Sequence, residues 1–232
     1  MGVAAIVLAA GAGRRMGGDL AKAYLPIAGR PLVLRTLDRM FATKTVEQVI
    51  LVVRAEEMDH CRALLGADTL LCHRPYQLQA GGSTRQQSAR RGLERLGADT
   101  NIVIIHDGAR PFVSAALIDR CVASAAVHGA VVVGLPALNT IKVVGDDHLI
   151  RSTPERRALW EIHTPQVFQR ELIVAAHQQA ERDGVEVTDD AMVVERLGKP
   201  VYVLEGERAN LKITLPEDVW LAEMMIQGGR VP

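Results

Sequence analysis

The sequence predicts an α/β fold in which helices cover both faces of one mostly parallel sheet. Short runs rich in Val and Ile alternate along the chain with longer segments whose apolar residues recur at helical spacing. The short runs contain almost no polar residues, which is typical of strands buried on both faces of a parallel sheet. The alternation and the uninterrupted apolar runs together indicate a Rossmann-like architecture.

The individual elements follow from this alternation. Strands are predicted at Val3–Ala9, Gln48–Val53, Ile102–Ile105, Ala130–Leu135 and Val201–Leu204. Helices are predicted at Leu32–Phe41, Glu56–Leu65, Ser83–Leu96, Ser114–Val127, Glu171–Asp183, Thr188–Leu197 and Pro216–Ile226. Ligands bind at the carboxyl edge of open α/β sheets, so the loops that follow the strands are the first place to look for a site.

One stretch interrupts the alternation of strands and helices. Thr140–Val144 and His148–Ser152 are β-prone, and the residues between them, Gly145-Asp146-Asp147, favour a tight turn. This predicts a β-hairpin arm over about residues 138–153 that projects from an otherwise single domain of residues 1–232. An isolated apolar hairpin is marginal in water, so we expect the arm to pack on a second copy of the chain in a homodimer.

Composition excludes several classes of function. The 232 residues are 48% hydrophobic, enough for a large core, and 27 basic residues balance 27 acidic ones, so no global basic field exists to hold a nucleic acid. The three cysteines lie far apart, which argues against a disulfide framework or a zinc site. The apolar run near the N-terminus is too short to cross a membrane and lacks the basic flank of a secretory signal, so we expect a cytoplasmic protein.

The loop after the first predicted strand has the chemistry of an anion site. Its small residues expose main-chain amides that phosphate oxygens can approach: Ala9, Ala10, Gly11, Ala12 and Gly13. Arg14, Arg15 and Lys22 follow, more positive charge than a diphosphate bridge usually receives. The spacing matches neither a P-loop nor a dinucleotide fingerprint. The alternative is a glycine-rich tight turn beside solvated cations.

Several motifs together resemble one enzyme family. "LAAGAGRRMG" followed by "KAYLPIAGRPL" is similar to the signature of sugar-type nucleotidyltransferases. "GGSTRQQSARRGL", "HDGARPF", "TIK", "HTPQVF", "VTDDA" and "ANLKITLPEDV" resemble, in order and spacing, 2-C-methyl-D-erythritol 4-phosphate cytidylyltransferases. The resemblance covers nearly the whole chain and implies a nucleotidyltransferase fold. It departs at Ala23, where the family usually has Gln.

The resemblance implies a reaction and assigns roles in binding CTP. In this family a sugar-alcohol phosphate attacks the α-phosphorus of CTP and pyrophosphate leaves. By resemblance Arg15 and Lys22 stabilise the charge at the α-phosphate, and the Ala9–Gly13 amides hold the triphosphate. The resemblance assigns Gly81, Gly82 and Ser88 to cytosine, Ala109 to the ribose, and Asp107 to a Mg²⁺ ion on the CTP phosphates.

The resemblance also assigns residues to the acceptor, methylerythritol phosphate. Arg156 and Lys212 position it for attack, and its phosphate or diol is contacted by Arg110, Thr140, Thr164 and Thr188. Thr140 and Arg156 flank the predicted arm, so an acceptor pocket built from two chains is expected. In "VTDDA", Asp189 and Asp190 also suit the first turn of a helix, where the helix dipole favours carboxylates.

Two alternatives to this function remain open. Ribitol 5-phosphate cytidylyltransferase shares the scaffold and motifs and differs in the acceptor. A non-catalytic nucleotide-binding module would be expected to lack charge-stabilising residues, yet the sequence retains them at Arg15, Lys22, Asp107, Arg156 and Lys212. A NAD-dependent dehydrogenase is disfavoured because Arg54 follows the second predicted strand, where an acidic residue would bind a ribose.

Overall fold

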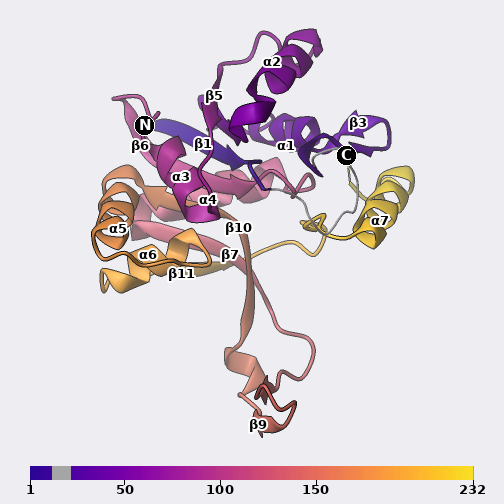
Figure 1. The fold of residues 1–232 in the computed structure, drawn as a ribbon. Helices are drawn as coiled ribbons and strands as arrows, with labels where there is room; N and C mark the ends of the chain where they lie inside the picture. The colour runs from indigo at the N-terminus through magenta and orange to yellow at the C-terminus, as the bar shows by residue number, and fades with distance from the viewer. Residues whose placement is uncertain (12–21, 232) are drawn as a thin grey trace.

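The fold is organised around a seven-stranded sheet in the order β11-β7-β10-β6-β1-β4-β5. A computed structural model describes residues 1–11 and 22–231 (Figure 1). The strands of this sheet are β1 (Gly2–Leu8), β4 (Gln48–Val53), β5 (Tyr76–Ala80), β6 (Thr100–Asp107), β7 (Ala130–Pro136), β10 (Trp160–Gln169) and β11 (Tyr202–Glu205). β10 is antiparallel to both of its neighbours, and the other pairings are parallel.

Two apolar cores cover the two faces of the sheet. Along β1 the side chains alternate, so that Val3, Ala5 and Val7 join one core and Ile6 joins the other. The first core packs beneath α1 (Leu32–Phe41), α2 (Met58–Ala67) and α4 (Ala115–His128). The second packs beneath α3 (Arg85–Leu93), α5 (Arg170–Arg182) and α6 (Asp190–Arg196). Strands buried on both faces explain the uninterrupted apolar runs of the sequence.

A third, smaller core attaches the C-terminal helix to the domain. Ile27 and Leu32 pack with Ala109, Ile213 and other buried residues near α7 (Pro216–Gln227). The short strands β2 (Pro26–Ile27) and β3 (Arg30–Pro31) pair beside this core. Within the described residues, no helix combines the length and apolar character that a membrane crossing requires.

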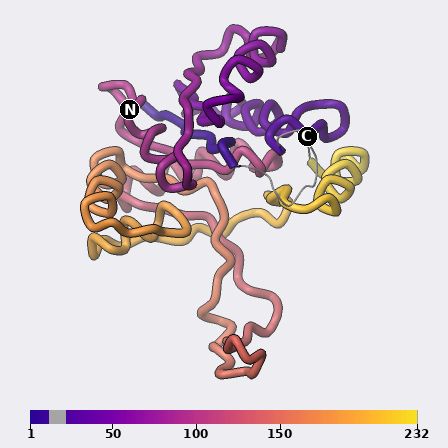
Figure 2. Tube along the Cα trace, viewed as in Figure 1, coloured from indigo at the N-terminus to yellow at the C-terminus, as the bar shows by residue number. Residues whose placement is uncertain are grey.

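An arm projects away from the layered domain (Figures 1 and 2). Its tip is a two-stranded sheet of β8 (Val143–Val144) and β9 (Ile150–Ser152), followed by a 3₁₀ turn, η4 (Arg156–Ala158). Six large apolar side chains of the arm are exposed: Leu138, Ile141, Val143, Val144, Leu149 and Ile150. The arm therefore buries little of its apolar surface against its own chain.

The structure confirms the predicted sheet, its two helical layers and the arm, and it corrects the strand count. β5 was missed because its sequence, YQLQA, alternates with glutamine, as suits a half-buried edge strand. β10 was missed because Pro165 interrupts its pattern. The pairing of β10 with β7 shifts register between His163 and Gln166, and this irregularity accommodates the proline.

Candidate active site

A cavity of about 650 Å³ opens at the carboxyl edge of the sheet. Its walls include the loops after four neighbouring strands, β6, β1, β4 and β5. Main-chain hydrogen bonds join the loops to the strand ends: Ala9 N donates to Val52 O (2.7 Å), Gly81 N to Val53 O (2.7 Å), and Gly108 N to Leu8 O (2.8 Å). The cavity is therefore held open by backbone contacts within one chain.

Gly81 lies where two of these loops nearly touch. A Cβ atom added at Gly81 would stand 2.6 Å from the Ala10 Cβ and 2.9 Å from the Ser88 Oγ. The Ser88 hydroxyl accepts from Gly82 N (3.1 Å) and donates to Thr84 O (2.9 Å), so it ties the Gly81–Thr84 loop to α3. Ala9, Ala10, Gly11, Gly81, Gly82 and Ser88, all predicted to bind CTP, line this cavity.

Asp107 ends β6 on the cavity wall and faces three cations. Its Oδ2 lies 2.7 Å from Lys212 Nζ, its Oδ1 lies 3.3 Å from Arg85 Nε, and Arg110 Nε is 3.9 Å from Oδ2. Burial alone would raise the pKa of Asp107, but the charges of Arg85 and Lys212 outweigh it and hold the pKa well below the ordinary 3.8. The carboxylate is therefore ionised at neutral pH.

A buried hydroxyl supports the end of β6 from β10. Thr164 Oγ1 accepts from the Asp107 amide (3.0 Å) and lies 3.2 Å from His106 Nδ1. His106 is fully buried, and its Nε2 lies 3.0 Å from Arg110 O. The Thr164 hydroxyl, predicted to contact the acceptor, is thus already engaged in positioning Asp107.

A second cavity of about 460 Å³ adjoins the first. Lys212 and Thr214 line both cavities, and Arg110 lines the second. Arg110 Nη1 donates to Asn210 O (2.8 Å), which orients the guanidinium. His163 also lines this cavity, and burial, with Arg110 and Lys212 nearby, lowers its pKa to about 4. The second cavity therefore presents cations and a neutral histidine to a ligand.

Three residues predicted to bind the acceptor lie outside both cavities. Thr140 and Arg156 are exposed on the arm, where Arg156 Nη1 donates to Leu138 O (2.9 Å). Thr188 is exposed just before α6. Of the residues described, none of these three lines either of the two cavities. Lys212, Arg110 and Ala109 come together beside Asp107, whereas Thr140, Arg156 and Thr188 do not.

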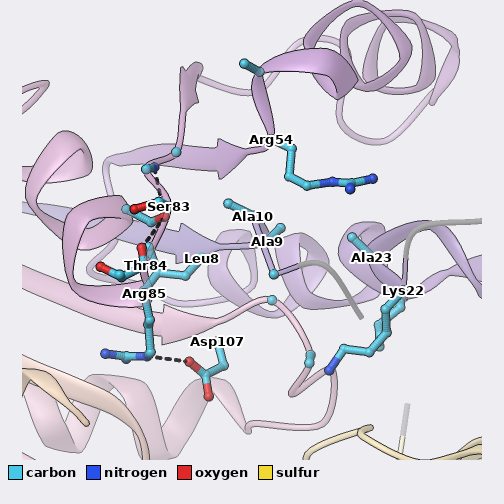
Figure 3. A pocket seen from close by; sticks show the side chains of 18 of the residues that line it. Leu8, Ala9, Ala10, Lys22, Ala23, Arg54, Ser83, Thr84, Arg85 and Asp107 are labelled. Carbon is cyan, nitrogen blue, oxygen red and sulfur yellow. Dashed lines mark hydrogen bonds and ion pairs between the residues drawn. The ribbon is translucent and has the colours of Figure 1, made fainter. Parts of the chain in front are cut away.

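Lys22 lines the first cavity on the wall opposite Asp107 (Figure 3). It begins the 3₁₀ helix η2 (Lys22–Tyr24), and its side chain extends toward the side where Asp107 lies (Figure 3). Ala23, the departure from the family pattern, also lines the cavity. Ala12, Gly13 and Arg15 lie outside the described residues.

Two arginines line the first cavity although the sequence assigned neither of them to a substrate. Arg85 is the first residue of α3, and Arg54 follows β4 and is clamped by Glu57 Oε1 (2.9 Å from Nε). Arg54 lies across the cavity from Asp107 (Figure 3). Arg85 stands in the motif "GGSTRQQSARRGL", but its partners are 22 and 105 residues away in the chain. Local spacing contains no signal for contacts that only the fold creates.

Comparison with known proteins agrees with this geometry. The family model for 2-C-methyl-D-erythritol 4-phosphate cytidylyltransferase matches residues 3–228. The chain belongs to this family. It is 40% identical over 227 residues to the 2-C-methyl-D-erythritol 4-phosphate cytidylyltransferase of Caldanaerobacter subterraneus subsp. tengcongensis, covering 98% of this chain and 100% of the relative. The counterpart from Symbiobacterium thermophilum is 41% identical, covering 97% of this chain and 93% of the relative.

Solved structures of the 2-C-methyl-D-erythritol 4-phosphate cytidylyltransferase family share the fold. The crystal structure of 4-diphosphocytidyl-2C-methyl-D-erythritolsynthase from Anaerococcus prevotii superposes with a TM-score of 0.86 at 31% identity, covering 97% of this chain and 96% of that one. The cytidylyltransferase structure from Thermus thermophilus gives a TM-score of 0.79 at 33% identity, covering 98% and 100%. The chain is therefore a nucleotidyltransferase, and the dehydrogenase alternative is removed.

Proposed function

We propose that this chain transfers CMP from CTP to 2-C-methyl-D-erythritol 4-phosphate, as an enzyme of the non-mevalonate route to isoprenoid precursors. The products are 4-diphosphocytidyl-2-C-methyl-D-erythritol and pyrophosphate. Membership in the cytidylyltransferase family carries the proposal. Two adjoining cavities that share Lys212 support it, because the reaction must bring two anionic substrates into contact.

The chemistry needs positioning and charge stabilisation rather than a general base. A phosphate monoester has a second pKa near 6, so at neutral pH the acceptor is largely a dianion that can attack unaided. Its oxygen forms a bond to the α-phosphorus of CTP while the bond from that phosphorus to the bridging oxygen breaks, and this oxygen leaves with pyrophosphate. The enzyme must overcome the repulsion between the two anions and hold them in line.

The cations around the two cavities suit these tasks. Lys22 and Arg15 are assigned to the charge that develops at the α-phosphate, and the amides of Ala9–Gly13 to the triphosphate. Lys212 lies on the boundary between the cavities, where one ammonium group reaches either substrate. Its contact with Asp107 (2.7 Å) holds it at that boundary. Arg110 is assigned to the phosphate of the acceptor.

A magnesium ion fits beside Asp107 only if it arrives with the nucleotide. Among residues 1–11 and 22–231, no group of three or more His, Cys, Asp or Glu side chains forms a metal cage. Mg²⁺ needs one or two carboxylates and takes its other ligands from phosphates and water, and Asp107 supplies one ionised carboxylate on the cavity wall. When bound there, the ion would neutralise charge on the CTP phosphates.

The acceptor half of the site is completed by a second copy of the chain in a homodimer. Thr140 and Arg156, assigned to the acceptor, line neither cavity of their own chain and are carried on an arm that projects from the layered domain (Figure 2). The exposed apolar side chains of the arm supply the surface that a partner would cover. We expect this dimer in the cytoplasm, where the three free cysteines would stay reduced.

A direct assay tests this function. The purified chain is incubated with CTP, magnesium and either 2-C-methyl-D-erythritol 4-phosphate or ribitol 5-phosphate, and pyrophosphate release is measured. We expect release with the methylerythritol acceptor and at least about tenfold slower release with the ribitol acceptor. The reverse preference would assign the chain to the ribitol alternative. No release with either acceptor, in a chain that binds CTP, would support the non-catalytic alternative.

A further inference from the structure

A buried carboxylate lies behind the first cavity without lining it. Asp190, the first residue of α6, is 1% exposed. Its Oδ2 accepts from Arg85 Nη1 at 2.7 Å, and its Oδ1 lies 3.1 Å from His177 Nε2. Its amide donates to Gln166 Oε1 at 2.9 Å. A charge this deeply buried is costly unless it is paired, and Arg85 supplies the opposite charge.

Arg85 connects Asp190 to the first cavity. The guanidinium lies between two carboxylates, with Nη1 on Asp190 and Nε 3.3 Å from Asp107 Oδ1. Arg85 and Asp107 both line the first cavity, and Figure 3 shows the contact between them. Asp190 therefore reaches the cavity through Arg85, and its shorter contact makes it the stronger anchor of the guanidinium.

The charges around Asp107 show why this anchor matters. Asp107 faces Arg85, Lys212 and Arg110, so one carboxylate is surrounded by three cations. Asp190 adds a second negative charge. Burial pushes the pKa of Asp190 upward, but Arg85 and the hydrogen bond from His177 outweigh it and hold the pKa below its ordinary value. The cluster therefore carries one excess positive charge with Asp190 and would carry two without it.

Building on the proposed function, we propose that Asp190 is a positioning residue for the metal–nucleotide complex. It anchors Arg85 and offsets its charge, so that Asp107 retains the negative potential that a divalent cation on a nucleoside triphosphate requires. Without this offset Arg85 repels the cation from Asp107 and attracts the triphosphate alone. Residues that support a metal ligand from behind typically change metal affinity by roughly 10- to 100-fold when they are replaced.

The test compares Asp190→Asn with a matched control, Asp189→Asn. Asp189 is the N-cap of α6, where Asn is an equally good cap, and it contacts Gln166 rather than Arg85. Each substitution removes one negative charge from the same helix terminus. CTP binding is measured by calorimetry in EDTA and across a magnesium titration, and thermal unfolding reports stability.

Asp190→Asn is expected to raise the magnesium concentration at half-maximal enhancement of CTP binding by roughly 10- to 100-fold. CTP affinity in EDTA should stay the same or increase. Asp189→Asn should match the wild-type chain in both conditions. A purely structural role for Asp190 would weaken CTP binding equally with and without magnesium, and that result would overturn the inference.

A second variant tests the same charge argument if Asp190→Asn does not fold. Arg85→Gln combined with Asp190→Asn removes one charge of each sign and restores the balance around Asp107. Its magnesium dependence should return to within about threefold of wild type, and a 10- to 100-fold shift in this double variant would contradict the charge argument. A wild-type chain that does not bind CTP would overturn the proposed function as well, whereas normal binding with an unshifted Asp190→Asn overturns this inference alone.

Discussion

The first cavity and the arm differ in how far their side chains are held by contacts within the chain. The cavity is formed from loops bonded to neighbouring strands of one sheet, and its charged side chains are held by contacts within the chain. The arm pairs only Val143–Val144 with Ile150–Ser152 and exposes most of its apolar side chains. Both regions carry residues assigned to substrate. We expect the site formed within one chain to bind CTP by itself, and the residues on the exposed arm to act only where a partner covers the arm.

Because of this difference, substitutions in the two regions should affect the two substrates separately. Lesions in the cavity should impair CTP binding or the reaction of bound CTP, and lesions on the arm should leave CTP binding unchanged. The boundary runs through Lys212, which lines both cavities. Variants on either side of that boundary should therefore give distinguishable kinetic defects.

The largest effect is expected from Lys22→Ala. Because Lys22 is assigned to charge that develops in the transition state, kcat should fall by roughly 10²- to 10⁴-fold with a smaller change in the KM for CTP. Steady-state kinetics with both substrates measures this split. An unchanged kcat with a raised KM would assign Lys22 to ground-state binding instead.

Gly81→Ala should weaken CTP binding by roughly 5- to 150-fold, because overpacking of a close contact typically costs about 1–3 kcal/mol. The new Cβ would stand 2.6 Å from the Ala10 Cβ and push the two loops of the cavity apart. Gly66→Ala is the matched control, since its Cβ would meet nothing within 4 Å. Calorimetry with CTP compares them, and equal affinities would show that the loops need not touch.

Arg156→Ala should raise the KM for the acceptor by roughly 10- to 100-fold, the typical loss of one hydrogen bond to a charged group. CTP affinity should be unchanged, because Arg156 is exposed on the arm. Calorimetry with CTP and steady-state kinetics with varied acceptor measure the two halves separately. A matching loss of CTP affinity would erase the distinction between the cavity and the arm.

The smallest effect concerns His163, which lines the second cavity. Its pKa falls from 6.5 to about 4 on folding, so the unfolded chain takes up a proton first. The stability that neutral His163 contributes is complete above pH 6.5 and is lost as the pH falls toward 4. Solvent screening of this half-buried group limits the change to below about 1 kcal/mol. His163→Gln should flatten the pH dependence of urea unfolding between these values, and an unaltered slope would contradict the assigned pKa.

The sequence predicted the parts of the fold that depend on local pattern. Apolar runs located β1, β4, β6, β7 and β11, and turn residues located the arm. β10 escaped because Pro165 and a register irregularity disguise a strand that only its neighbours stabilise. In the site, the motifs led to Asp107, Lys212 and the glycine loop. The sequence placed Asp190 in the first turn of a helix, as the structure has it. Its ion pair with Arg85 escaped because it joins residues 105 positions apart, a contact that exists only after folding.

Subunit exchange tests the shared acceptor site most directly. Lys22→Ala places its lesion in the first cavity and Arg156→Ala places its lesion on the arm. With the acceptor held below the wild-type KM, each variant alone is expected to keep at most about a tenth of the wild-type activity. If each arm completes the partner's acceptor site, one site of the heterodimer carries both lesions and the other carries neither.

The two purified variants are mixed, exchange is verified with differently tagged subunits, and pyrophosphate release is followed. With shared sites, activity should reappear as heterodimers form, up to about half the wild-type activity per heterodimer. If each chain instead builds its own complete site, both sites of the heterodimer stay damaged. Activity that remains at the level of the separate variants after verified exchange would contradict the shared site.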